Sequence, residues 1–107
     1  MEYYGSSSKL QKILGNERLL VKHYGKLKAE QIGLRLQEFT QAKTLAEIRT
    51  LPPTKLHGLK GDRKNQFAVN ISPNWRMIFE GYNADEVQSL KKDEIITLLI
   101  VEIEDYH

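Results

Sequence analysis

Residues 67–80 read FAVNISPNWRMIFE, and this stretch decides the fold class. Apolar side chains occupy every second position on both sides of a turn signal, Ser72-Pro73-Asn74. They are Phe67, Val69 and Ile71 before the turn, and Trp75, Met77 and Phe79 after it. This period is typical of half-buried strands, so the stretch predicts a β-hairpin.

Downstream of the hairpin, the chain is first polar and then strongly apolar. Gly81–Asp93 contains Gly, Asn and Asp and predicts a long connection. Glu94–Glu104 is rich in Ile, Leu and Val with almost no alternation. It predicts a central strand that is covered on both faces.

Upstream of the hairpin, the periodicity is helical. Ile32, Leu36 and Phe39 form one apolar stripe, and Leu51-Pro52-Pro53 ends the helical region. The predicted helices are Lys9–Leu14, Glu17–Tyr24 and Lys26–Ala42, followed by a short helical turn with a capping box at Thr44-Leu45-Ala46-Glu47. Helices followed by strands predict an α+β fold, with helices on one face of a small antiparallel β-sheet.

The 107 residues form one domain, and they contain no cysteine. Disulfides, thiolate metal sites and cysteine nucleophiles are therefore excluded. The longest apolar run, within Ile95–Ile103, is too short to span a bilayer, and Met1–Ser8 lacks the features of a secretory signal. We therefore expect a soluble protein in the cytoplasm, with no membrane partner.

The net charge of +2 conceals an asymmetry along the chain. Residues 1–79 carry 14 Lys and Arg against 6 Asp and Glu, whereas residues 80–107 carry 2 against 8. This asymmetry indicates a polyanion partner for the basic part. The alternative is a surface on which the two signs mix once the chain folds.

Three places carry groups suited to phosphate chemistry. Residues 55–64 (KLHGLKGDRK) combine His57 with the cations Lys60, Arg63 and Lys64. Arg76 lies in mid-strand, where it either pairs with a neighbouring Glu or binds a phosphate. The alternatives are that residues 55–64 are an ordinary basic loop and that Arg76 forms a surface ion pair.

The third place is the end of the chain, where Asp105, Tyr106 and His107 offer a carboxylate, a phenol and an imidazole. In a regular strand, Asp105 and His107 share a face and Tyr106 points away, so all three converge only if the strand ends first. An exposed tail is the alternative. The histidines lack metal-ligand spacing, and no serine hydrolase or nucleotide-binding glycine motif is present.

Taken together, three blocks resemble the HigB branch of the RelE/ParE toxin superfamily, the "plasmid maintenance killer" toxins. They are LHGLKGD at 56–62, WRMIFE at 75–80 and IEDYH at 103–107. The resemblance implies a microbial-RNase-like fold, with N-terminal helices on a small twisted antiparallel sheet. It also implies a toxin of a type II toxin–antitoxin system, an endoribonuclease that cuts messenger RNA during translation.

The resemblance also implies roles for particular residues. His57, Asp105, Tyr106 and His107 match the family's proposed catalytic residues, and Arg76 matches its phosphate-facing arginine. Lys60 matches a basic residue, and Arg63 and Lys64 are further RNA-binding candidates. Cleavage through the 2′-hydroxyl then requires no metal and no cofactor, and either histidine is a candidate for the acid or the base.

The implied partners are a HigA-type helix-turn-helix antitoxin, the messenger RNA, and the ribosome near the A site of the 30S subunit. Operator DNA is expected to be bound only through the antitoxin. The alternative function is a ParE-like toxin that poisons DNA gyrase without catalysis, and a third is an inactive RNA-binding module. The sequence departs from compact relatives in the long connection at Asn83–Asp93.

Overall fold

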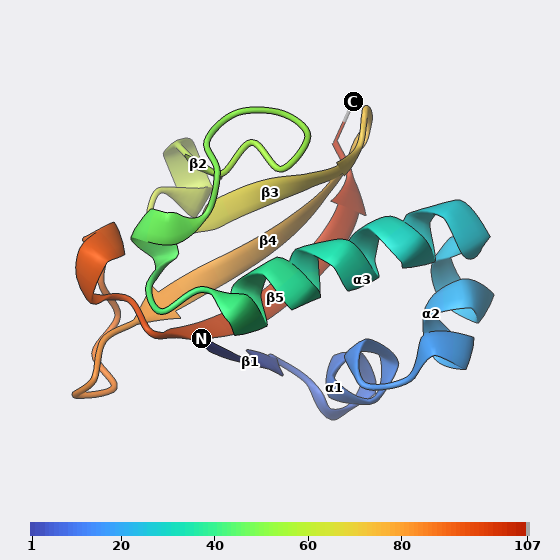
Figure 1. Cartoon of the computed structure of the whole chain (residues 1–107), viewed down its shortest axis with the longest axis horizontal. Helices are drawn as coiled ribbons and strands as arrows, with labels where there is room; N and C mark the ends of the chain where they lie inside the picture. Colours follow the sequence, from blue (N-terminus) through green and yellow to red (C-terminus); the bar gives the residue numbers. More distant parts are fainter. Residues whose placement is uncertain (107) are drawn as a thin grey trace.

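The computed structural model describes residues 1–106, and its sheet has five strands in the order β1-β5-β4-β3-β2 (Figure 1). His107 lies outside the described residues. The strands are β1 (Glu2–Gly5), β2 (His57–Gly58), β3 (Phe67–Ser72), β4 (Trp75–Tyr82) and β5 (Thr97–Asp105). Helices and sheet together confirm the α+β class.

The predicted hairpin is confirmed as β3 and β4. Phe67 lies opposite Phe79 and Val69 opposite Met77, so the alternating apolar residues of the two strands share one face. The register shifts between Asn70 and Ser72, next to the turn. The hairpin is therefore the frame on which the rest of the sheet is built.

The sheet is mixed, which corrects the expectation of a purely antiparallel one. β1 runs parallel to β5, with Glu2 opposite Thr97 and Gly5 opposite Ile100. β1 was not predicted, because its four residues carry too little alternation to indicate a strand. Gly5 is needed there, since a Cβ would lie 2.5 Å from the backbone nitrogen of Gln11.

The strand predicted within Glu94–Glu104 is β5, and it is flanked by β1 and β4. The expectation that this strand is covered on both faces is wrong. Leu98 and Ile100 are buried, whereas Leu99 and Val101 are only partly covered. The helices α1 (Ser8–Leu14), α2 (Glu17–Tyr24) and α3 (Lys26–Gln41) all pack on the same side of the sheet (Figure 1).

The three predicted helices are present within one or two residues of their expected ends. Ser7 caps α1 by accepting from the backbone nitrogen of Leu10, and Asn16 caps α2 by accepting from that of Leu19. Gly25 separates α2 from α3 with a φ of 84°. No helix in the described part of the chain is long and apolar enough to cross a membrane.

The predicted capping box differs in detail. The short turn is a 3₁₀ helix, η1 (Leu45–Glu47), and Thr44 makes no side-chain cap. The Glu47 carboxylate instead accepts from the backbone nitrogen of Lys43, one residue earlier than a capping box requires. Two further 3₁₀ helices are η2 (Gly61–Arg63) and η3 (Lys92–Glu94).

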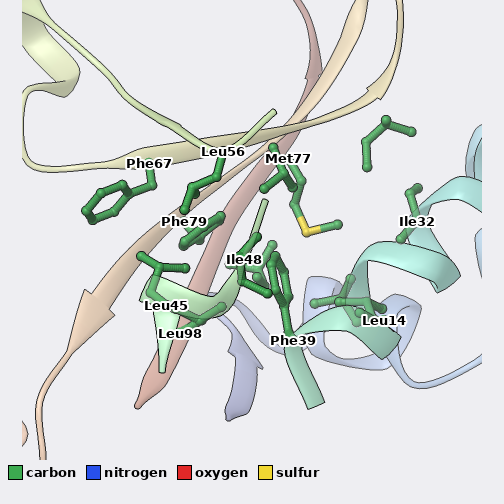
Figure 2. Packing of buried hydrophobic residues seen from close by; sticks show 14 of the residues in the cluster. Leu14, Ile32, Phe39, Leu45, Ile48, Leu56, Phe67, Met77, Phe79 and Leu98 are labelled. Atoms are coloured by element: carbon green, nitrogen blue, oxygen red, sulfur yellow. The ribbon is translucent and has the colours of Figure 1, made fainter. Parts of the chain in front are cut away.

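The core lies between α3 and the sheet, and aromatic rings are at its centre (Figure 2). The ring of Phe79 stacks on that of Phe67 at 5.9 Å and meets Phe39 of α3 edge-on at 5.3 Å. Ile32 and Leu36 of the predicted stripe are buried beside them. This packing leaves the opposite face of the sheet, here called the outer face, without a covering α-helix.

Candidate active site on the outer face

Arg76 and Glu104 form the central ion pair of the outer face. They lie directly opposite each other on β4 and β5. Oε1 of Glu104 accepts from Nε of Arg76 at 2.9 Å and from Nη2 at 2.8 Å. The two side chains are 20% and 22% exposed, so water screens their attraction only in part. Of the two roles expected for Arg76, the structure shows the pairing with a neighbouring Glu, and phosphate binding stays a prediction.

Arg63 reaches the same place from η2. It forms ion pairs with Glu102 and, at 3.9 Å, with Oε2 of Glu104. Because β4 and β3 separate β2 from β5, the Arg63 side chain has to lie across the outer face. On the same face, Ile78 lies opposite Glu102 and is fully buried although it does not belong to the main core.

The polar network continues along the face beyond Arg63. The Arg63 guanidinium donates to Gln66 at 2.9 Å, and Gln66 donates to Glu80 at 3.2 Å. Glu80 also accepts from the Tyr82 hydroxyl at 2.9 Å. Burial, together with the Glu80 carboxylate, raises the pKa of the Tyr82 phenol. Tyr82 therefore stays neutral and donates to Glu80 at physiological pH.

At the end of the chain, β5 stops at Asp105 and the next residue turns onto the outer face. The backbone nitrogen of Tyr106 donates to Asn74 at 3.0 Å, and its hydroxyl donates to Pro73 at 3.2 Å. The Tyr106 ring lies under the guanidinium of Arg76, with Cζ 4.8 Å from the ring centroid. This contact places Tyr106, one of the terminal candidates, against Arg76.

Asp105 lies opposite Trp75, and paired residues of antiparallel strands share a face. Trp75 faces the helices, because it contacts Tyr24 of α2 and Lys28 of α3. The backbone therefore directs Asp105 away from Arg76 and Tyr106. The predicted role of His107 concerns a residue outside the described part of the chain.

His57 lies on the outer face at the other edge of the sheet. It is opposite Ala68 on β3, which is opposite Ile78 on β4. Its Nδ1 is 2.8 Å from the carbonyl oxygen of Lys55. Since a carbonyl only accepts, Nδ1 carries the hydrogen, and Nε2 of the neutral ring is the atom able to take up a proton.

The structure therefore places His57, Arg63, Arg76 and Tyr106 on one face without bringing all of them into contact, whereas the backbone directs Asp105 to the other face. With strands about 4.8 Å apart, the backbone of His57 is about 10 Å from that of β4. Lys60 and Lys64 flank η2 and are exposed. The result is an open surface rather than an enclosed pocket, with ion-paired arginines and glutamates at its centre and a histidine at its edge.

Two carboxylates of this site, Glu102 and Glu104, were not among the predicted residues. Their signal in the sequence is that they interrupt the most apolar strand at every second position. Nowhere in residues 1–106 do three His, Asp or Glu side chains gather in an arrangement able to hold a metal ion.

A scan against models of known protein families finds no match. A curated relative is Endoribonuclease HigB from Proteus vulgaris, which is 32% identical over 78 residues, covering 73% of this chain and 71% of the relative. The chain belongs to the HigB family of RelE/ParE toxins.

The fold of this HigB-family toxin agrees with that assignment. It superposes on the YoeB/ParE toxin from Agrobacterium tumefaciens with a TM-score of 0.62, covering the whole of both chains at 12% sequence identity. At this identity the similarity establishes the fold alone. The fold and the family expected from the three sequence blocks are thereby both confirmed.

Proposed function

We propose that this HigB-family toxin is a metal-free endoribonuclease that cleaves messenger RNA on the translating ribosome. One observation carries the proposal: Arg63, Arg76 and His57 lie on the one sheet face that no α-helix covers. We propose that an RNA strand lies along this face. The Proteus vulgaris relative, named an endoribonuclease, supports the same activity.

The chemistry follows from what RNA supplies itself. Its 2′-hydroxyl is the nucleophile, so the protein has to remove one proton, stabilise the crowded phosphorane and protonate the leaving 5′-oxygen. Nε2 of His57 is placed to take or give a proton at the edge of the face. Arg76 and Arg63 supply N–H donors for the phosphate oxygens.

Tyr106 is one of the terminal candidates, and it contacts Arg76 of the proposed site. The Tyr106 ring lies against Arg76, where it limits the orientations of the guanidinium and offers a surface for a base to stack on. Asp105 and His107 remain candidates by resemblance, with His107 as the second proton-transfer group. Lys60 and Lys64, both exposed, are proposed to contact the RNA backbone.

The partners follow from the proposed activity. The basic part of the chain is proposed to dock on ribosomal RNA near the A site of the 30S subunit, through contacts that weaken with salt. The cytoplasm is then the place of action. A HigA-type helix-turn-helix antitoxin is the proposed inhibitor, and it provides the link to operator DNA.

The alternative is a toxin that poisons DNA gyrase without catalysis. The two are separated by adding the purified chain to a translating bacterial extract and to a gyrase supercoiling reaction. The proposal predicts message fragments that require translating ribosomes, together with normal supercoiling. An intact message alongside trapped gyrase–DNA breaks would contradict it. Ribosome binding without cleavage would indicate an inactive RNA-binding module.

A further inference from the structure

One carboxylate, that of Glu104, contacts both arginines of the outer face. Its Oε1 binds Nε and Nη2 of Arg76, and its Oε2 lies 3.9 Å from Nη2 of Arg63. The strand register places Arg76 opposite Glu104, but no strand pairing involves Arg63, which lies in η2. Glu104 thus connects two cations from separate segments of the chain.

Two guanidinium groups repel each other, and a negative charge between them offsets this repulsion. Here the Arg63 side chain is 33% exposed and that of Arg76 is 20% exposed, so solvent only partly reduces the repulsion. We propose that Glu104 is a positioning residue that holds Arg63 and Arg76 together as a two-arginine clamp for the phosphate of the RNA backbone. This inference rests on the proposed endoribonuclease function.

The ion pair leaves the clamp able to bind a phosphate. A guanidinium has five N–H donors, and Glu104 engages Nε and one hydrogen of Nη2 of Arg76. Tyr106 contacts Arg76 through the face of its ring. The edge of Arg76 that carries Nη1 is therefore compatible with a phosphate oxygen.

Glu102 has a different relation to the clamp. It pairs with Arg63 alone, and its side chain is 44% exposed, twice the exposed fraction of Glu104. An exposed carboxylate of this kind is easily exchanged for a phosphate. We therefore assign the positioning role to Glu104, and expect the Arg63 to Glu102 contact to open when RNA binds.

The same contacts allow an opposite role, in which Glu104 masks the arginines from RNA. The two roles differ in the sign of a measurable effect. If Glu104 positions the clamp, removal of its charge slows cleavage and changes RNA binding little. If Glu104 masks the clamp, removal of its charge strengthens RNA binding and speeds cleavage.

The test uses Glu104→Gln, which keeps the shape of the side chain and removes its charge. Glu30→Gln is the matched control, because Glu30 is exposed on α3 at the opposite face of the sheet. Cleavage is timed at saturating toxin in a translating extract. Binding is measured on programmed ribosomes whose message carries a 2′-deoxynucleotide at the cut site. We expect a cleavage rate lower by about 10- to 100-fold for Glu104→Gln, in line with the cost of small misplacements in active sites.

Little change in binding is expected for either variant. Cleavage by Glu104→Gln at the rate of the Glu30→Gln control would overturn the proposal, as would tighter binding with faster cleavage. A third readout is independent of activity: hydrogen exchange of Nε–H of Arg76, followed by NMR. It should be slow in the wild type and fast in Glu104→Gln. Exchange that is equally fast in both proteins would overturn the proposed clamp, even if the chain cleaves RNA.

A wild-type chain that cleaves no RNA would contradict the proposed function itself, whatever the exchange rates show.

Discussion

Tyr106 lies against Arg76, with the guanidinium carbon 4.8 Å from the centroid of the ring. Arg76 is therefore held from two sides, by the Tyr106 ring and by the Glu104 carboxylate, which its Nη2 meets at 2.8 Å. A cation with this support loses little conformational freedom when it binds a phosphate. Two hydrogen bonds to the β3–β4 turn hold Tyr106 in this position.

Arg76→Ala is expected to lower the cleavage rate by about 10²- to 10³-fold, the usual cost of removing one donor that stabilises transition-state charge. The measurement is message cleavage in a translating extract at saturating toxin. Lys91→Ala is the control, since it removes an exposed cation that lies outside the basic part of the chain. Equal rates for the two variants would remove Arg76 from the site.

His57→Ala is expected to slow cleavage by about 10²- to 10⁴-fold, the range for loss of a general acid or base. The reason is the hydrogen bond of Nδ1 to Lys55, which leaves Nε2 as the proton acceptor of the neutral ring. His23→Ala removes an exposed histidine from α2 and serves as the control. Wild-type cleavage by His57→Ala would show that His57 has no part in proton transfer.

Two glycine substitutions are expected to change stability in opposite directions. A Cβ at Gly5 would lie 2.5 Å from the backbone nitrogen of Gln11, so Gly5→Ala should destabilise the fold by about 1–3 kcal/mol. At Gly33, inside α3, a Cβ meets nothing within 4 Å, so Gly33→Ala should stabilise it by about 0.4–1 kcal/mol. Urea denaturation measures both, and a stable Gly5→Ala variant would contradict the close approach of β1 to α1.

The Tyr82 phenol is expected to make the free energy of unfolding fall as the pH rises above about 10. Burial and Glu80 raise the pKa of its phenol in the folded state, so the folded protein holds this proton more firmly than the unfolded chain. The stabilisation is complete below the unfolded pKa of about 10 and is lost as pH rises through the folded value. Tyr82→Phe should therefore lose less stability between about pH 9 and 11 than the wild type. Denaturation across that range tests this, and an identical decline would contradict it.

Much of the fold could be predicted because its signals are local. The hairpin follows from alternation on either side of Ser72-Pro73-Asn74, and the ends of α1 and α2 follow from Ser7, Asn16 and the glycines that come after them. β1 could not be predicted in this way. Its four residues pair in parallel with residues 97–100 at the other end of the chain, and only tertiary packing fixes that contact.

The candidate site likewise has residues that the sequence identifies and contacts that only the folded structure shows. Motif blocks identify Arg76 and His57, but nothing local shows that Glu104 faces Arg76, because this depends on the register of β4 against β5. The register itself shifts between Ile78 and Phe79, so a regular pairing would misplace the partners. Arg63 was named as part of a basic loop, and its ion pairs arise only because η2 folds over the sheet.

The most direct test of the proposed function is to map message cleavage by primer extension in a translating bacterial extract. The wild-type chain is compared with a variant lacking Asp105–His107, whose folding is checked by circular dichroism and denaturation. We predict discrete cuts that require translating ribosomes and disappear with the folded truncated variant. A message that stays intact with the wild type, or cuts that persist after truncation, would contradict a ribosome-dependent endoribonuclease whose site includes the end of the chain.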